Sequence, residues 1–158
     1  MAIQAIKSAS RAASPLRILV VENHADTRDV LVSLLEGLGH TVVVAESMRA
    51  ALRAAPRAHC DVLISDIGLP DGDGWELLGQ LNLPRPMYAI AMSGYGMTAD
   101  RTRSKVAGFR HHLVKPMGIE QLEGILKEVA AEIGKSRRGR ARDSQRAEPA
   151  VQVQTSDS

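Results

Sequence analysis

Several side chains that could do chemistry stand where short apolar runs of the sequence end. One of them is Asp66, which follows the apolar run Val62–Ile64 and Ser65. Three other runs end in Glu22 and Asn23, in Ser93 and Gly94, and in Lys115. Carboxylate and amide oxygens suit a hard divalent cation such as Mg²⁺, whereas lysine and serine side chains suit a phosphoryl group. The residue types therefore make Asp66 a candidate nucleophile or metal ligand.

These side chains can meet only if the apolar runs are parallel strands of one sheet. Short apolar runs alternate with helical patterns between Arg17 and Ile133, which is typical of βα units. The residues that follow parallel strands collect at one edge of the sheet, where ligands bind. The five predicted strands are Ile18–Val21, Val42–Ala45, Val62–Ile64, Tyr88–Met92 and His112–Val114.

Helices are predicted between the strands from apolar spacing and from residues that cap or break helices. Apolar residues recur three and four positions apart from Val30 to Leu38 and from Ile119 to Ile133. These two helices are expected to stop at glycines, Gly39 and Gly134. The shorter predicted helices are Met48–Ala55 closed by Pro56, Gly74 towards Leu81 with Asp73 as N-cap, and Thr98–Ala107 ended by Gly108.

The composition is that of an ordinary soluble protein with room for one domain. The chain has 158 residues, of which 44% are hydrophobic and 24% are charged. No apolar run approaches the roughly 20 residues that span a bilayer, and the first residues lack the apolar core of a secretory signal. The single cysteine, Cys60, cannot form an internal disulfide, which fits a reducing compartment. We therefore expect a cytoplasmic protein without a membrane partner.

The two ends of the chain differ from its centre. Residues 1–15 show no clear element and are expected to be a flexible N-terminal segment, and residues 16–134 form the predicted domain. Lys135 to Arg146 holds six basic residues and one acid, and no apolar periodicity continues beyond Ile133. Residues 135–158 are therefore predicted to be a disordered basic and polar tail. A solvated tail is the favoured interpretation, and a contact with nucleic acid, a membrane or an acidic partner is the alternative.

Four motifs stand along the chain in order and with compatible spacing. They are Ile18–Asn23, Leu63–Asp66 with Leu69-Pro70 and Asp73-Gly74, Ala91–Gly94, and Leu113–Pro116. Together they resemble the motifs of a response regulator receiver domain, the phosphoacceptor module of two-component signalling, and the resemblance spans Leu16 to Ile133. It implies a flavodoxin-like, doubly wound (βα)5 fold, which is an α/β architecture with a parallel sheet in the strand order 2-1-3-4-5.

The resemblance implies a role for each polar residue at the sheet edge. Asp66 would accept a phosphoryl group from a phosphohistidine on a histidine kinase or histidine phosphotransfer protein. Lys115 would be the fixed cation, while Ser93 and the amide of Gly94 would bind the phosphoryl group. Pro116 would follow a cis peptide bond. The implied ligands of Mg²⁺ are Glu22, Asn23, Asp66 and the backbone carbonyl of Gly68.

Two positions depart from the usual pattern of the family. Asn23 stands where a second acid most often contacts the metal, so Mg²⁺ should bind more weakly without phosphorylation being lost. His112 stands where an aromatic residue usually acts as a switch coupled to the hydroxyl of Ser93. Imidazole can form hydrogen bonds and titrate near neutral pH, so His112 is a candidate switch of another kind. The alternative for His112 is a partly exposed strand residue without that role.

The resemblance implies a signalling domain and not an enzyme, because the only catalysis would be its own phosphoryl transfer and dephosphorylation. Nothing after Ile133 is expected to form a DNA-binding domain, so output would go through a downstream protein or a homodimer formed by residues 98–133. One alternative is a pseudo-receiver with a decayed metal site, and another is a module of a hybrid histidine kinase that acts as a phosphate sink. A haloacid-dehalogenase-like phosphatase is disfavoured, because Gly68 stands where those enzymes have a second Asp.

The remaining histidines are scattered without the spacing of metal ligands, so no zinc site is predicted. They are His24, His40, His59 and His111. Trp75 is expected near the rim of the site, where it could touch a partner.

Overall fold

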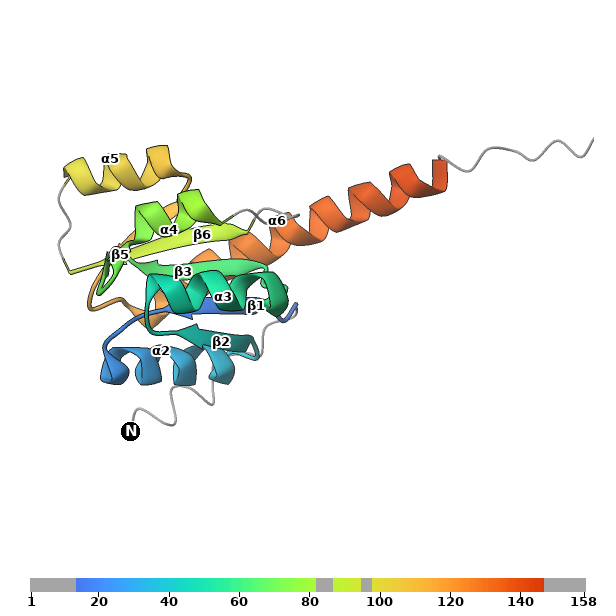
Figure 1. Cartoon of the computed structure of the whole chain (residues 1–158). Helices are drawn as coiled ribbons and strands as arrows, with labels where there is room; N and C mark the ends of the chain where they lie inside the picture. Colours follow the sequence, from blue (N-terminus) through green and yellow to red (C-terminus); the bar gives the residue numbers. More distant parts are fainter. Residues whose placement is uncertain (1–13, 82–86, 95–97, 147–158) are drawn as a thin grey trace, which may run out of the picture.

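The computed structural model describes residues 14–81, 87–94 and 98–146, and its centre is a five-stranded parallel sheet (Figure 1). The strands follow the order β2-β1-β3-β6-β7, which is the predicted order 2-1-3-4-5 once the short extra pair is set aside. This confirms the predicted fold class. The strands of the sheet are β1 (Arg17–Val21), β2 (Thr41–Ala45), β3 (Val62–Asp66), β6 (Tyr88–Ser93) and β7 (His111–Val114). The extra antiparallel pair is β4 (Gly68–Leu69) with β5 (Gly72–Asp73).

The central strands are buried because helices cover both faces of the sheet. Every residue of β3 is buried, and so are all residues of β1 except Arg17. This burial accounts for the continuous apolar runs of these strands, which lack the alternation of a half-exposed strand. β2 lies at an edge of the sheet and is more open, with Val44 48% exposed. The same two-sided cover keeps water away from the polar residues at the central strand ends.

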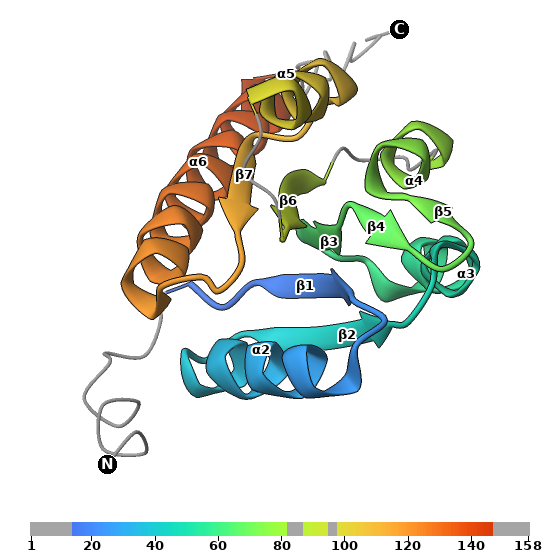
Figure 2. The same cartoon turned by 90° about the vertical axis from the view of Figure 1, so that its left-hand side faces the viewer.

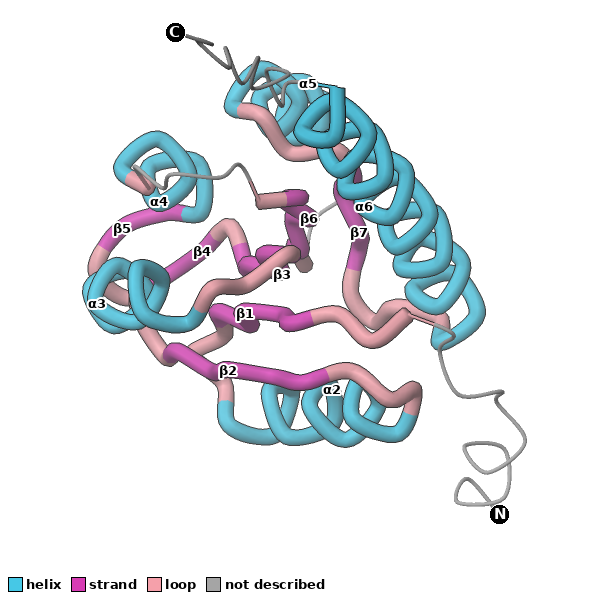
Figure 3. The backbone as a smooth tube through the Cα atoms, turned by 90° about the vertical axis from the view of Figure 1, so that its right-hand side faces the viewer, coloured by secondary structure: helices cyan, strands magenta, loops and turns pink. Residues whose placement is uncertain are grey.

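Helices lie on both faces of the sheet (Figures 2 and 3). Each face has its own apolar core. α2 (Ala25–Gly37) and α6 (Ile119–Arg146) pack on one face through residues such as Leu35 and Leu126. α3 (Met48–Ala58) and α4 (Gly74–Gln80) pack on the other face through residues such as Ala51 and Leu77. α5 (Thr98–Ala107) lies beside α4 and β7. The side chain of Asp73 caps α4 as predicted, since its Oδ1 accepts a hydrogen bond from the backbone N–H of Glu76 at 2.7 Å.

Two details of the predicted helices are wrong. The helix expected to close at Pro56 continues to Ala58 and ends at His59, whose φ of 50° is left-handed. Proline lacks an N–H group, but this removes one bond in the last turn only, and the burial of Ala55 and Ala58 keeps the turn against the sheet. Val30, expected on the buried stripe of the first helix, is 63% exposed, because α2 packs through a narrower stripe.

The last helix is longer than predicted. Gly134 does not end it, and α6 continues to Arg146, so the prediction of a disordered tail is wrong for residues 135–146. Among the described glycines only Gly39 and Gly108 have a positive φ, so Gly134 lacks the left-handed conformation of a stop. Apolar periodicity reports packing against the rest of the protein, whereas an exposed run rich in Arg, a good helix former, can be helical without it.

The extra length of α6 projects beyond the sheet (Figure 1). An ion pair fastens its near part to the body, because Arg137 Nη2 lies 2.9 Å from Asp61 Oδ1. The rest of the predicted tail, residues 147–158, and most of the predicted N-terminal segment, residues 1–13, lie outside the described residues. Within the part of the chain that the structure describes, no helix is long and apolar enough to cross a membrane.

Candidate functional site

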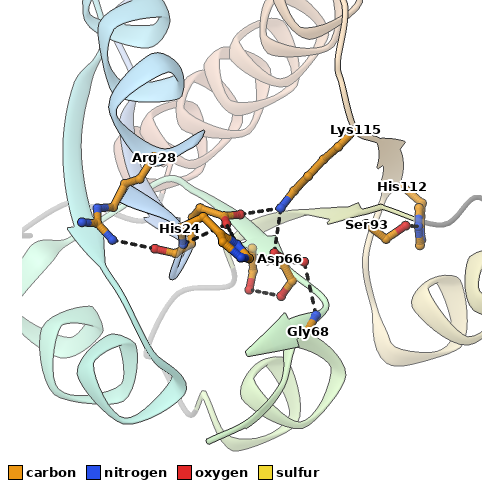
Figure 4. A network of polar contacts seen from close by, with 9 residues as sticks. His24, Arg28, Asp66, Gly68, Ser93, His112 and Lys115 are labelled. Atoms are coloured by element: carbon orange, nitrogen blue, oxygen red, sulfur yellow. Dashed lines mark hydrogen bonds and ion pairs between the residues drawn. The ribbon is translucent and has the colours of Figure 1, made fainter. Parts of the chain in front are cut away.

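The carboxyl ends of β1, β3 and β7 bring two carboxylates and an ammonium group into direct contact (Figure 4). Lys115 Nζ lies 2.7 Å from Asp66 Oδ2 and 2.7 Å from Glu22 Oε2. Lys115 is 49 residues from Asp66 and 93 residues from Glu22 in the chain, and the three meet because their strands run parallel in one sheet. Three of the side chains expected at this edge of the sheet therefore meet there.

Burial and the shared lysine set the charges of this cluster. Burial raises the pKa of Asp66 above its ordinary value, and the nearby charge of Glu22 adds to this, while the hydrogen bond from Lys115 opposes it. Burial would also raise the pKa of Glu22, but the hydrogen bonds from Lys115 and His24 outweigh the effect of burial. The pKa of Glu22 is therefore below its ordinary value. Burial alone would lower the pKa of Lys115, yet its bonds to both acids raise it. Two carboxylates therefore share one cation.

Each carboxylate uses one oxygen for Lys115 and keeps the other oxygen for different contacts. Asp66 Oδ1 accepts a hydrogen bond of 3.2 Å from the backbone N–H of Gly68. Glu22 Oε1 lies 3.0 Å from His24 Nδ1 and accepts a bond of 3.2 Å from the backbone N–H of His24. One ligand atom each from Glu22, His24 and Asp66 lies within 4.8 Å of the others. With one negative charge in excess, this donor set fits a divalent cation.

The other expected metal residues lie around this cluster. Asn23 lies two positions beyond the end of β1, after Glu22, and is exposed to solvent. Gly68 begins β4 and is also exposed, and a Cβ atom added to it would meet no heavy atom within 4 Å. The spacing of the histidines in the sequence does not mark His24 as a metal ligand, but its side chain lies beside Glu22 and Asp66. The turn from β1 into α2, and not a regular ligand spacing, brings the imidazole there.

The residues expected to hold a phosphoryl group stand on the neighbouring strands. Ser93 ends β6, one position beyond Met92, which pairs with Asp66 in the sheet. Gly94 follows and is exposed. The backbone N–H of Lys115 donates to the backbone carbonyl of Ser93 at 2.8 Å, and the peptide bond between Lys115 and Pro116 is cis, as the resemblance implies.

A chain of polar contacts leads from Ser93 away from the carboxylates. Ser93 Oγ lies 2.7 Å from His112 Nε2, and His112 Nδ1 lies 2.8 Å from Ser104 Oγ (Figure 4 shows the first pair). Trp75 Nε1 donates to Ser104 Oγ at 2.9 Å. Arg103 covers the indole ring at 4.0 Å from its centre. We call the four residues Ser93, His112, Ser104 and Trp75 the serine–histidine chain.

One direction of donation runs through the serine–histidine chain. Since Trp75 donates to Ser104, the Ser104 hydroxyl can donate to Nδ1 of a neutral His112, and Nε2–H can then donate to Ser93. Burial favours this neutral form, because it lowers the pKa of His112, as does the charge of Arg101, while Asp100 opposes the shift. Ser104 is 1% exposed, so its contacts are not shared with bulk water. No sequence pattern pointed to Ser104 or to its bond with Trp75.

Comparisons with known proteins agree with this arrangement. A family model described as the response regulator receiver domain matches residues 18–127. The chain is 39% identical over 103 residues to a 14.6 kDa protein of Leptolyngbya boryana, covering 63% of this chain and 79% of that protein. It is 34% identical over 110 residues to the KDP operon transcriptional regulatory protein KdpE of Escherichia coli, covering 70% of this chain but only 49% of KdpE.

A solved structure matches the fold over the same region. It is the receiver domain of sensor histidine kinase PA1611 from Pseudomonas aeruginosa, with a magnesium ion coordinated in its active site cleft. The TM-score is 0.66 at 28% identity, over 75% of this chain and 99% of that one. On the family match, the fold and the strand order, the chain belongs to the response regulator receiver domain family.

Proposed function

We propose that this chain is a phosphoacceptor receiver in which Asp66 takes a phosphoryl group from a phosphohistidine of a histidine kinase or phosphotransfer protein. The observation that carries the proposal is the position of Lys115, whose ammonium group touches Asp66 and Glu22 at 2.7 Å each. A fixed cation beside a carboxylate at the edge of a parallel sheet is suited to charge that develops on a transferring phosphoryl group. The phosphorylated protein would signal through protein contacts.

The transfer forms one bond and breaks one bond. An oxygen of the Asp66 carboxylate attacks phosphorus, the bond between phosphorus and the histidine nitrogen breaks, and the nitrogen keeps the electron pair. Lys115 lies on Asp66 Oδ2 and can move with the charge onto a phosphoryl oxygen. Ser93 and the amide of Gly94 lie at the end of the adjacent strand β6 and would bind a second oxygen. The product is an aspartyl phosphate, which water later hydrolyses.

Mg²⁺ would supply charge neutralisation at the phosphoryl oxygens. The residues that would hold it are Glu22, Asp66, the carbonyl of Gly68 and, through its amide oxygen, Asn23. Magnesium is present in the receiver of PA1611, which supports its use here. Glu22 is fully buried, so bulk water and salt screen its charge less than they would at the surface.

Replacing Asn23 with Asp is expected to tighten Mg²⁺ binding about tenfold, because a carboxylate replaces a neutral amide next to the ion. Asn23 is exposed, so the folded structure should tolerate the new charge. The measurement is a calorimetric Mg²⁺ titration of both proteins, with Asn23→Ala as the companion that removes the amide oxygen. Identical titrations of the wild-type protein and Asn23→Asp would contradict a role of position 23 in metal binding.

The test of phosphoacceptance is the incorporation of phosphate from phosphoramidate, a small donor with the same phosphorus–nitrogen bond as phosphohistidine. Intact-mass measurement should detect one added phosphoryl group with Mg²⁺ and none when a chelator is present. If no adduct forms with either, the chain is a pseudo-receiver that only binds a partner. An adduct that forms equally well without a divalent ion would remove the metal from the proposal.

We also infer that the serine–histidine chain is the switch of this receiver. When Ser93 turns towards a phosphoryl group, His112 loses the partner of Nε2, and the contacts of Ser104 and Trp75 at the other end must adjust. The serine–histidine chain joins β6 and β7 to α5 and α4, so it leads to the surface between α4 and α5. A target or homodimer that contacts residues 98–133 would respond to changes at Ser104 on α5.

Replacing Ser104 with Ala should uncouple Trp75 from the state of Asp66. Trp75 is the only tryptophan in the sequence, so the intrinsic tryptophan fluorescence of the protein reports on this end of the serine–histidine chain. We expect phosphoramidate with Mg²⁺ to change the fluorescence of the wild-type protein and to leave that of Ser104→Ala unchanged, although the mass adduct forms in both. The variant should also lose about 1 to 3 kcal/mol of stability, because Trp75 and His112 lose a buried partner.

The matched control for this variant is Ser136→Ala, which removes an exposed serine hydroxyl on α6. It should keep the fluorescence change of the wild-type protein. A full fluorescence response in Ser104→Ala would remove Ser104 from the switch and leave only the contact of Ser93 with His112.

A phosphate sink is the second candidate. The chain is similar to the receiver domain of a sensor histidine kinase as well as to a transcriptional regulatory protein. A receiver that only takes up phosphate from a kinase would act as a sink without a downstream target. A fluorescence change at Trp75 on phosphorylation favours an output role, because a sink needs no conformational signal.

A further inference from the structure

We propose that the imidazole of His24 is a ligand of the divalent ion and gives this site a preference for Mn²⁺ over Mg²⁺. The inference rests on the proposed metal site and goes beyond it, because it adds a nitrogen donor to a set expected to hold only oxygens. It also gives a function to a histidine that lies within reach of both carboxylates. Three observations support it.

The first observation is the separation of two donor atoms. His24 Nδ1 lies 3.0 Å from Glu22 Oε1. In an octahedral complex with metal–ligand bonds of about 2.1 Å, two adjacent ligand atoms are separated by about 3.0 Å. One atom each of Glu22, His24 and Asp66 already lies within 4.8 Å of the others. An ion therefore requires only small movements of these side chains to contact all three.

The second observation is how the oxygens are divided. Lys115 contacts Glu22 Oε2 and Asp66 Oδ2, which leaves Glu22 Oε1 and Asp66 Oδ1 to other partners. The His24 ring lies against Glu22 Oε1, the oxygen that Lys115 does not contact. A metal ion bound to Glu22 Oε1 and Asp66 Oδ1 would be separated from the ammonium group of Lys115 by the two carboxylates. The two positive charges would then lie on opposite sides of the acids.

The third observation concerns the neighbour of His24. Asn23 offers a neutral amide oxygen and no carboxylate, so it adds no negative charge to the site. A hard ion such as Mg²⁺ is affected most by the missing charge, because it binds chiefly through charged oxygens and keeps its water. Imidazole binds transition-metal ions more tightly than it binds Mg²⁺, so His24 compensates for the neutral Asn23 only when the ion accepts a nitrogen ligand. The preference of the site therefore shifts from Mg²⁺ towards Mn²⁺.

The alternative is an ordinary hydrogen bond between His24 and Glu22 without any metal role. The side chain of His24 is 70% exposed, so its removal should not disturb the core. The two roles differ in one spectroscopic property: a nitrogen bound directly to Mn²⁺ is strongly coupled to the electron spin of the ion, whereas a nearby nitrogen that is not a ligand is coupled only weakly. This coupling does not depend on phosphorylation.

The experiment is pulsed electron paramagnetic resonance of Mn²⁺ added to the full chain, together with Mn²⁺ and Mg²⁺ titrations by calorimetry. We expect a nitrogen coupling in the wild-type protein, its loss in His24→Ala, and its retention in His111→Ala, which removes another partly exposed histidine. His24→Ala should weaken Mn²⁺ binding about tenfold or more and change Mg²⁺ binding much less. Asn23→Asp should reduce the preference for Mn²⁺.

Each outcome supports the ligand role of His24 or overturns it. Mn²⁺ that binds without nitrogen coupling would overturn that role and leave the phosphoacceptor proposal intact, since phosphoramidate with Mg²⁺ tests that separately. Coupling that persists in His24→Ala would assign the nitrogen to another group and overturn it as well. If neither ion binds, the metal site itself is absent, and both the inference and the metal part of the proposed function are wrong.

Discussion

Replacing Lys115 with Met is expected to reduce phosphoryl incorporation at Asp66 about a hundredfold or more, because a preorganised cation beside the reacting oxygens is lost. The same change should lower the free energy of unfolding at neutral pH by about 3 kcal/mol, because two buried carboxylates lose the cation between them. Methionine keeps most of the volume and apolar length of the lysine stem. The loss therefore reports on charge and not on packing.

The stability defect of Lys115→Met should shrink as the pH falls. The pKa of Asp66 is already above its ordinary value in the folded protein, and it rises further without Lys115, which opposes the effect of burial. The folded state of the variant therefore binds a proton more tightly than the unfolded chain does. The destabilisation is then fully present above the raised pKa and relieved below the unfolded value. Urea unfolding at about pH 7.5 and at about pH 5 measures this difference. Lys105→Met, an exposed lysine on α5, is the control, and an equal defect at both pH values would contradict the shared-cation model.

Replacing Gly74 with Ala should damage the site through the backbone of Asp66. A Cβ atom at Gly74 would lie 2.7 Å from the backbone oxygen of Asp66 and 3.2 Å from Cα of Ile67. Both are backbone atoms, so the start of α4 must move away from the end of β3. We expect a loss of about 2 kcal/mol of stability and about a tenfold slower phosphoryl incorporation, since small displacements of a reacting group are costly.

Gly79→Ala is the matched control, because Gly79 is in the same helix and its added Cβ atom would meet no heavy atom within 4 Å. Alanine favours helix over glycine, so this variant should be as stable as the wild-type protein or more stable by about 0.5 kcal/mol. Thermal or urea unfolding compares the two variants. Equal stability of Gly74→Ala and Gly79→Ala would show that α4 can shift without moving Asp66.

The sheet could be predicted well from the sequence because burial on both faces leaves a simple pattern. Continuous apolar runs such as Val62–Ile64 indicate buried strands when helical patterns alternate with them. The positions of Asp66 and Lys115 at the strand ends follow from the same runs, and the N-cap Asp73 follows from its place before a helical pattern. These features depend on local sequence and on the parallel direction of the strands, which helical crossovers require.

The features that could not be predicted depend on contacts between distant segments or on weak local preferences. His24 reaches the carboxylates through the geometry of one turn, and Ser104 reaches His112 only because α5 packs beside β7. Neither contact produces a spacing rule. Gly134 and Pro56 were expected to end helices, but both positions keep helical backbone where neighbouring residues favour it.

The most direct test of the central claim is to locate the phosphoryl group. The protein is incubated with phosphoramidate and Mg²⁺, the acyl phosphate is reduced with borohydride, and the modified residue is identified by peptide mass spectrometry. The proposed function predicts one modified residue, Asp66, and no modification in Asp66→Asn. A modification at another residue, or an unmodified chain under conditions where Mg²⁺ is bound, would contradict it.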